Sequence, residues 1–382
     1  MHVTRIESFD DPAIGPEAWN RLSGDMPFLR REWLESWWRH YGTRGDLYVL
    51  AVNDSTGRLV AVAPWYWRRS PLGGRVLCFL ASGEVCSDYL RVPCLPSCED
   101  TAAQAIADWL DGFGADDWDT LDLEGIDPTD ATLFRLIDHL DAHGHPVHQS
   151  CDARCWRLEL PATWDEYLAR LSRSRRREAR ALWRANFDTK RAIVHVVDHV
   201  DNLDRGLEIL AELHRRRRES LGDRGRFDSP RFRAFHHDAA RTLVEQGRAR
   251  LSWLELEGQP VAADYNLLGG DTIYHYQTGM DPAWRHEQPG WLAVMASLRA
   301  AIVGGYRAFD FLRGDEPYKS QWRAHPQPLL RLRVAGLGTE ARLRHRAWLA
   351  GKSTKRWAKK TRDLWNHRAV PSPADLVGAS SA

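Results

Sequence analysis

The chain of 382 residues has little cysteine, methionine or lysine, and it has no long apolar run. Its two close cysteine pairs, Cys94/Cys98 and Cys151/Cys155, are spaced C-x3-C and so lack the C-x2-C spacing of a zinc ribbon. We therefore expect reduced thiols and no metal site. No segment approaches the ~18 apolar residues of a membrane span. The first residues also lack a signal-peptide layout, so we expect a cytoplasmic protein.

The net charge of +1 provides no global field that would select nucleic acid. Only six of the 53 basic residues are lysine, and arginine gathers at 170–191 and 342–368. Such runs are most often solvated helix faces. The alternative is an anionic partner, which could be a phosphate-bearing cofactor, a lipid-linked or polymeric substrate, or the inner face of a membrane.

The same order of elements, a hairpin, a strand, a helix and a second strand, is predicted twice. In the first half these elements span residues 47–67, 75–81, 101–113 and 120–125. In the second half they span residues 249–268, 271–280, 291–303 and 309–314. The repeat predicts a mixed α/β fold built from a duplicated unit. We expect units at 1–158, thought to be structural, and 159–340, thought to be active, and then a basic helix and disordered tail at 341–382.

Helical material is expected at 163–246, in the second unit and ahead of its hairpin. Thr163 and Glu166 form a capping box, from which one helix could run to about Phe187. Two further helices are expected at 203–220 and 229–246.

The stretch 271–322 predicts a ligand site. A strand interrupted near Gly279, a helix that follows Pro289-Gly290 and a second strand make a right-handed crossover with parallel strands. Open α/β sheets bind ligands at the carboxyl ends of such strands. Pro289-Gly290 also leaves backbone N–H groups at the helix start, where a phosphate could bind.

Two motifs in this stretch resemble a known family. Gln288-Pro289-Gly290 precedes the apolar helix, and FDFLRGDEPYKSQW at 309–322 follows it. Together with SRSRRREARALWR at 172–184 and the segment 79–89, they are similar to GNAT-fold acyltransferases of the CelD-like, or BioF-like, type. These are relatives of the FemAB peptidoglycan aminoacyltransferases, which carry two GNAT units in tandem. The resemblance covers residues 20–335, although the phosphate loop retains only Gln288 and Gly290.

The resemblance implies direct transfer of an acyl group, typically acetyl, from acyl-CoA to an amine or a hydroxyl. It also implies a small-molecule, sugar or peptide acceptor and a place in envelope or extracellular polysaccharide biosynthesis. An N–H near Gly279 could stabilise the oxyanion. The residues expected to bind the cofactor are Arg285, Gln288, Pro289, Gly290 and Trp291.

Four residues after the last crossover strand are the catalytic candidates: Asp315, Glu316, Tyr318 and Lys319. Either acid could be the base, or could be a loop acid that caps the next helix. Tyr318 could donate a proton or simply pack. Lys319 is the only lysine between Lys190 and Lys352, which suggests a task that arginine would perform poorly.

A second group of residues could contact the substrate. Asp264 is also a lesser candidate for the base, and His275 is expected on the same strand face as Gln277. The residues expected at the substrate are Asp264, His275, Gln277, Arg313 and Trp322.

Two other functions remain open. A FemAB-type enzyme would use aminoacyl-tRNA, and the basic segments would then contact RNA phosphate. Against this function, the segment between the units lacks a long coiled-coil arm. A non-catalytic pair of GNAT units could instead be a scaffold, since the first unit has no Tyr-Lys after Gly125-Ile126-Asp127-Pro128.

Overall fold

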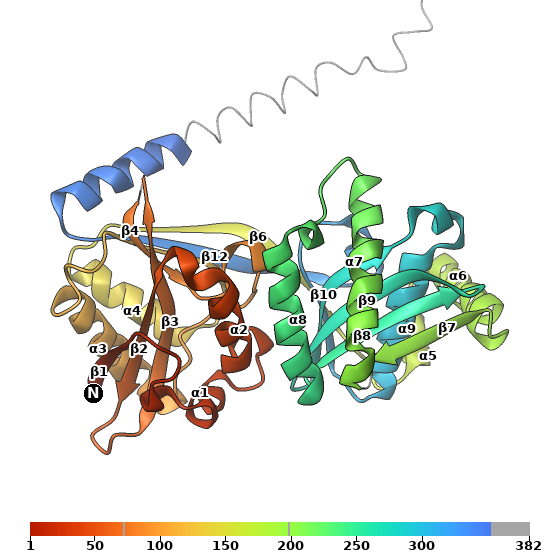
Figure 1. The fold of residues 1–382 in the computed structure, drawn as a ribbon, viewed down its shortest axis with the longest axis horizontal. Helices are drawn as coiled ribbons and strands as arrows, with labels where there is room; N and C mark the ends of the chain where they lie inside the picture. The colour runs from red at the N-terminus through yellow and green to blue at the C-terminus, as the bar shows by residue number, and fades with distance from the viewer. Residues whose placement is uncertain (72, 198, 353–382) are drawn as a thin grey trace, which may run out of the picture.

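The computed structural model describes residues 1–71, 73–197 and 199–352, and their strands form one twelve-stranded mixed sheet (Figure 1). In sheet order the strands are β1 (His2–Ile6), β2 (Asp46–Asn53), β3 (Leu59–Ser70), β4 (Gly74–Phe79), β5 (Thr120–Ile126), β12 (His325–Ala335), β6 (Val147–Glu159), β11 (Ala308–Arg313), β10 (Thr272–Met280), β9 (Gln259–Gly269), β8 (Ala249–Leu256) and β7 (Ala192–Val197). Two neighbouring pairs, β4/β5 and β10/β11, are parallel. Each pair belongs to one of the two predicted repeats, so the mixed α/β fold is confirmed.

Helices cover both faces of the sheet. The helices of the first half are α1 (Pro16–Ser23), α2 (Arg31–Tyr41), α3 (Glu99–Asp111) and α4 (Ala131–Ala142). Those of the second half are α5 (Trp164–Arg170), α6 (Arg173–Trp183), α7 (Leu203–Glu219), α8 (Pro230–Glu245), α9 (Pro289–Val303) and α10 (Pro317–Gln321). The larger apolar core joins the first half to α7 and α8, and a second core lies under α5, α6 and α9. Between the halves α2 packs on α8, with the rings of Trp33 and Phe235 4.9 Å apart.

The last strand of the chain lies in the middle of the sheet. β12 pairs with β5 on one side and with β6 on the other. The last residues of β6 also pair with β11. Ion pairs fix this insertion, because Arg331 and Arg333 of β12 both bind Asp122 of β5, at 2.9 and 2.7 Å. The predicted boundary near residue 158 thus falls inside the sheet, at the end of β6, and the division into two units stays a prediction.

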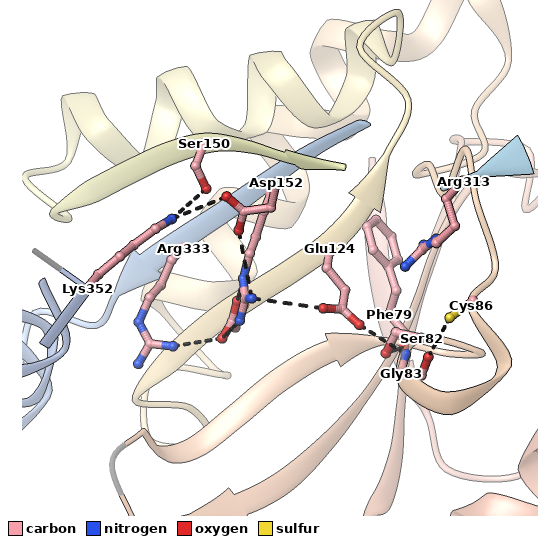
Figure 2. A network of polar contacts seen from close by, with 12 residues as sticks. Phe79, Ser82, Gly83, Cys86, Glu124, Ser150, Asp152, Arg313, Arg333 and Lys352 are labelled. Atoms are coloured by element: carbon pink, nitrogen blue, oxygen red, sulfur yellow. Dashed lines mark hydrogen bonds and ion pairs between the residues drawn. The ribbon is translucent and has the colours of Figure 1, made fainter. Parts of the chain in front are cut away.

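The helical segment 339–352 packs on the same region. Its Lys352 Nζ donates to Ser150 Oγ of β6 at 2.9 Å and lies 3.4 Å from Asp152, near Arg333 (Figure 2). The rest of the predicted basic helix, from residue 353 on, and the predicted disordered tail lie outside the described residues. Among the described helices, none combines the length and apolar character needed to cross a bilayer.

The single helix predicted from Thr163 to Phe187 is wrong. Thr163 does cap a helix, since its Oγ1 accepts the Glu166 N–H at 3.2 Å, but α5 ends at Arg170. The Arg176 guanidinium binds the carbonyls of Leu168, Ala169 and Leu171 at that end. A second cap, Ser172, then starts α6. This arginine reaches back from the next helix and binds carbonyls at the end of α5.

The predicted interruption at Gly279 is also wrong. β10 continues through Gly279 to Met280, and the irregularity is a bulge between His275 and Gln277. A Cβ atom on Gly279 would lie 2.5 Å from the backbone nitrogen of His214 in α7. The glycine therefore allows a helix to pack closely against the strand.

Candidate active site

The candidate site lies where β10 and β11 separate. The two strands pair over three residues only, Thr272–Tyr274 with Ala308–Asp310, while β10 continues beside β9 to Met280. α9 begins at this opening. A cavity of about 280 Å³ occupies it. Its lining residues are Arg217, Ala262, Asp264, His275, Thr278, Gly279, Met280, Gly290, Trp291, Ala293, Val294, Tyr318 and Trp322.

The cavity brings together six residues predicted from the sequence: Asp264, His275, Gly290, Trp291, Tyr318 and Trp322. They come from β9, β10, the start of α9 and the segment after β11. Gln277 was expected beside His275, and this placement is wrong. The bulge at Tyr276 shifts the alternation of side chains, so that Thr278 and Met280 line the cavity.

Asp264 is the acid inside the cavity. It is 5% exposed, and this burial raises the pKa of its carboxyl to about 7. Ser297 of α9 donates a hydrogen bond to Asp264 Oδ2 at 3.1 Å and opposes the rise only in part. A carboxyl with such a pKa exchanges its proton near neutral pH, as a general base or acid must.

His275 lies beside this acid as a neutral imidazole. Burial, together with the charge of Lys319, lowers its pKa to about 3. Its Nδ1 lies 2.8 Å from Asn266 Oδ1, which can only accept, so Nδ1 carries the proton. Nε2 then has a lone pair and lies 3.8 Å from Asp264 Oδ1. Asn266 thereby fixes the tautomer of a histidine that adjoins the candidate base.

Aromatic rings wall the other side of the cavity. Trp291 stacks on Trp322 with ring centroids 3.8 Å apart, and the Arg175 guanidinium lies 5.2 Å from the Trp291 ring. Burial, with the charges of Glu316 and Asp264, raises the pKa of Tyr318. Its phenol therefore stays protonated at neutral pH and can donate a proton.

The start of α9 offers fewer backbone donors than the sequence suggested. Pro289 has no N–H, and the N–H groups of Trp291 and Leu292 already donate to the Gln288 carbonyl at 2.9 and 3.0 Å. Gly290 lines the cavity, and its N–H has no hydrogen-bond acceptor among the described residues. Arg285 and Gln288 are exposed and do not line the cavity.

Arg217 is the cation that sequence reasoning missed. It lines the cavity from α7. The sequence showed Arg215–Arg218 only as a run of charge. The signal was the helical spacing, because residue 217 follows the buried Leu210 by seven and Leu213 by four and so lies on the same helix face.

The remaining candidates at the end of β11 and after it lie outside the cavity. Asp315 and Glu316 are exposed, and Trp156 Nε1 donates to Asp315 Oδ1 at 3.3 Å. Lys319 is buried, and its Nζ donates to the carbonyls of Leu312, Arg313 and Gly314 at 3.1, 2.9 and 3.1 Å. Arg313 Nε donates to the buried Asp88 of the first half at 2.5 Å. Catalytic or substrate roles for these four residues stay predictions.

Comparison with known proteins matches this region to a family. Residues 173–320 match the family model described as an acetyltransferase (GNAT) domain. This match contains every lining residue of the cavity except Trp322. A search of curated proteins finds no match.

Solved structures extend the likeness to both halves. The crystal structure of FemX is 12% identical, covers 87% of this chain and 97% of its own, and has a TM-score of 0.60. A conserved protein of unknown function from Bacteroides thetaiotaomicron VPI-5482 is 9% identical, covers 87% and 100%, and has a TM-score of 0.53. At these identities the likeness concerns the fold alone. The chain therefore has a FemX-like fold, and its residues 173–320 are similar to the GNAT domain family.

Proposed function

We propose that this protein is an acyltransferase that moves an acyl group from acyl-CoA to an amine, with Asp264 as the general base. The observation that carries the proposal is a buried carboxyl with a pKa of about 7 in the cavity between β10 and β11. A base of this pKa suits deprotonation of an ammonium group at neutral pH. The site also lies within the part of the chain that matches GNAT acetyltransferases.

The lining fits the parts of a CoA thioester. The apolar wall of Ala293, Val294 and the stacked Trp291 and Trp322 suits a pantetheine arm. The Gly290 N–H, at the positive end of a fifteen-residue helix, suits a phosphate oxygen. Arg217 adds a positive charge in the cavity itself.

The reaction needs no covalent enzyme intermediate. Asp264 accepts a proton from the acceptor ammonium, and the free amine nitrogen attacks the thioester carbonyl carbon. The new C–N bond forms as the C–S bond breaks, the thiolate leaves, and the nitrogen releases its second proton to solvent. Tyr318, neutral and in the same cavity, is placed to protonate that thiolate, and the Asp264 proton restores the phenol through solvent.

The test compares the two acids. Asp264→Asn should lower kcat for thiol release from acetyl-CoA, with a panel of amino sugars and peptides as acceptors, by about 100-fold or more. Calorimetry with CoA should show unchanged binding, because Asn keeps the size of the side chain. A full rate in Asp264→Asn together with a large loss in Asp315→Asn would move the base to Asp315. No binding of CoA or acetyl-CoA would reject an acyl-CoA donor.

The pH profile gives a second test. In the wild type, kcat/KM should rise with pH up to about 7 and then level, because the base must lose its proton. Ser297→Ala removes the hydrogen bond that lowers the pKa of Asp264, so the profile should shift to higher pH. A profile that Ser297→Ala leaves in place would contradict Asp264 as the titrating group.

We also propose that the acceptor is a sugar or peptide amine of envelope polysaccharide synthesis, and that the exposed arginines of α6 help to hold an anionic part of it. Arg173, Arg177 and Arg180 are exposed on this helix, and Arg175 of the same helix lies over Trp291 at the cavity. Acceptors with and without a phosphate group should therefore differ in KM. Arg177→Gln should reduce that difference.

A further inference from the structure

The cavity between β10 and β11 contains one permanent charge, the guanidinium of Arg217. Among the other lining residues, only Asp264, His275 and Tyr318 can ionise. Burial lowers the pKa of His275 to about 3 and raises the pKa of Tyr318, so both side chains are neutral at pH 7. Asp264, with a pKa of about 7, carries its negative charge only part of the time. The cavity is therefore positive on balance until an anion enters it.

The Arg217 side chain lacks the partners that its neighbours have. It stands in a run of four arginines at the end of α7. Each of the other three forms an ion pair with a carboxylate: Arg215 with Glu219, Arg216 with Asp281 and Arg218 with Asp223. The Arg217 guanidinium is partly buried and has neither an ion pair nor a hydrogen bond within the described part of the chain. The arginine without a partner is thus the one that lines this cavity.

Arg217 and the start of α9 reach the cavity from opposite faces of the sheet. Successive residues of β10 alternate between the faces, so Thr278 shares the face of Asp264, its partner in β9, and Gly279 lies on the other. Ser297 of α9 donates to Asp264, whereas α7 packs against Gly279. Both Thr278 and Gly279 line the cavity, which therefore opens past the end of β10 to the side of α7. An acyl-CoA along α9 and a group bound to Arg217 would approach the base from two sides.

We propose that the acceptor is an amine that also carries a carboxylate, as in an amino acid or a peptide with a carboxylate near its amine, and that Arg217 binds this carboxylate. The inference rests on the proposed transfer of an acyl group to an amine. A planar guanidinium donates two parallel N–H bonds to the two oxygens of a carboxylate, which fixes the direction of the acceptor as well as its distance. The ammonium of the same molecule then lies at Asp264. Because the cavity measures about 280 Å³, the two groups must lie a few bonds apart.

Two other anions are less well placed to contact Arg217. The CoA phosphates suit the start of α9, on the other face, and the pantetheine arm separates them from the thioester that the amine attacks. A dicarboxylic acyl-CoA would supply a carboxylate in its acyl group, but that group follows the thioester and enters from the side of α9. The charge of Arg217 attracts an acyl-CoA at a distance, whereas its position on α7 favours direct contact with the acceptor.

The test compares amines with and without their carboxylate, at saturating acetyl-CoA: glycine with glycinamide, and L-lysine with L-lysinamide. The wild type should have a lower KM for each acid than for its amide. Arg217→Gln should raise the KM of the acids by about 30-fold or more, because it removes a charged partner of the carboxylate. It should leave kcat and the KM of the amides nearly unchanged. Arg217→Lys keeps the charge but loses the planar fork, so its KM for the acids should lie in between.

Arg241→Gln is the matched control, since Arg241 is exposed on α8 and does not line the cavity. It should behave as the wild type does with every acceptor. A wild type that prefers the amides, or an Arg217→Gln that affects acids and amides alike, would overturn the proposal. A preference for succinyl-CoA over acetyl-CoA that disappears in Arg217→Gln would place the carboxylate on the acyl group and overturn it as well.

Binding measured without acyl-CoA separates this inference from the proposed function. In calorimetry the wild type should bind the acids more tightly than their amides, and Arg217→Gln should lose that difference. If this result appears but no thiol is released with any acceptor, acyl transfer is rejected and the carboxylate site stands. If thiol release depends on Asp264 but neither binding nor KM of the acids depends on Arg217, the proposed function stands and the carboxylate site is rejected.

Discussion

Asp264 is a residue whose burial should favour activity and reduce stability. Its pKa of about 7 in the folded protein lies above the ordinary value of 3.8. Between these values the folded state keeps the proton and the unfolded state releases it. Burial of Asp264 therefore costs no stability below about pH 4, where the carboxyl is protonated in both states. Stability is lost as pH rises through 7.

Asp264→Asn should remove this loss, since an amide does not titrate. We expect the variant to unfold at nearly the same denaturant concentration as the wild type at pH 4. At pH 8 it should be more stable, by at most about 4 kcal/mol for a shift of three pKa units. Urea unfolding at both pH values measures this difference. The buried Asp310, with a pKa also of about 7, is present in both proteins and cancels in the comparison. A gain that is equal at both pH values would contradict the titration of Asp264.

Lys319 should stabilise the folded protein whether or not it has the predicted catalytic role. Its Nζ binds three successive carbonyls at the end of β11 and an exposed acid, Glu316, at 2.9 Å. Lys319→Met would leave buried carbonyls without a donor and should cost about 2–4 kcal/mol. The measurement is chemical unfolding. Lys352→Met, which removes a lysine from a surface pair, should cost under about 1 kcal/mol.

At the scale of elements, the close contact of β10 with α7 depends on Gly279. Gly279→Ala would place a methyl group 2.5 Å from the His214 nitrogen, so α7 must move. We expect a loss of about 1–3 kcal/mol in unfolding free energy. The affinity for CoA should also fall, because Arg217 moves with α7. Gly15→Ala is the control, since the nearest atom to its added Cβ is 3.8 Å away and its φ of −50° is not strained. If the two variants are equally stable, the close packing is not essential.

The elements were largely predictable because local patterns define them. Alternating apolar residues gave the hairpins of both halves, and Thr163 gave a helix start. The misplaced features depend on contacts between distant segments. Gly279 resembles a strand breaker until α7 is seen against it, and no local pattern shows that Arg176 binds the last carbonyls of the preceding helix.

The sequence predicted which residues line the candidate site better than it predicted which acid is the base. Six of its lining residues could be named from the sequence, because the crossover β10–α9–β11 must bring them to one end of the sheet. The sequence favoured Asp315 over Asp264 as the base. The pKa of Asp264 results from burial beneath α9, and this burial depends on how that helix packs. Arg217 was missed because a charged run conceals a helical spacing.

At the scale of the whole molecule, the segment 87–89 of the first half supports the strand that ends at the site. Asp88 binds Arg313, and the Tyr89 hydroxyl donates to the buried Asp310 Oδ2 at 2.7 Å. The first half therefore positions β11, whatever else it binds.

Tyr89→Phe should test this support. Loss of the hydroxyl removes a hydrogen bond that lowers the pKa of Asp310, so that pKa should rise further. We expect a loss of about 1–3 kcal/mol in unfolding free energy, which should be larger at pH 8 than at pH 5 because a buried carboxylate then lacks its donor. Tyr306→Phe is the control, since the Tyr306 hydroxyl has no hydrogen-bond partner among the described residues. A loss in Tyr89→Phe that is the same at both pH values would contradict this account.

The insertion of β12 between β5 and β6 bears on how the protein is made. A ribosome synthesises residues 1–160 first, yet the neighbour of β5 consists of residues 325–335. The first half must therefore wait, with an open strand edge, while a further length of chain about equal to its own emerges. Such an edge invites wrong pairing during that interval. We expect nascent chains stalled before residue 325 to bind chaperones, and release of the full chain to close the sheet from the middle.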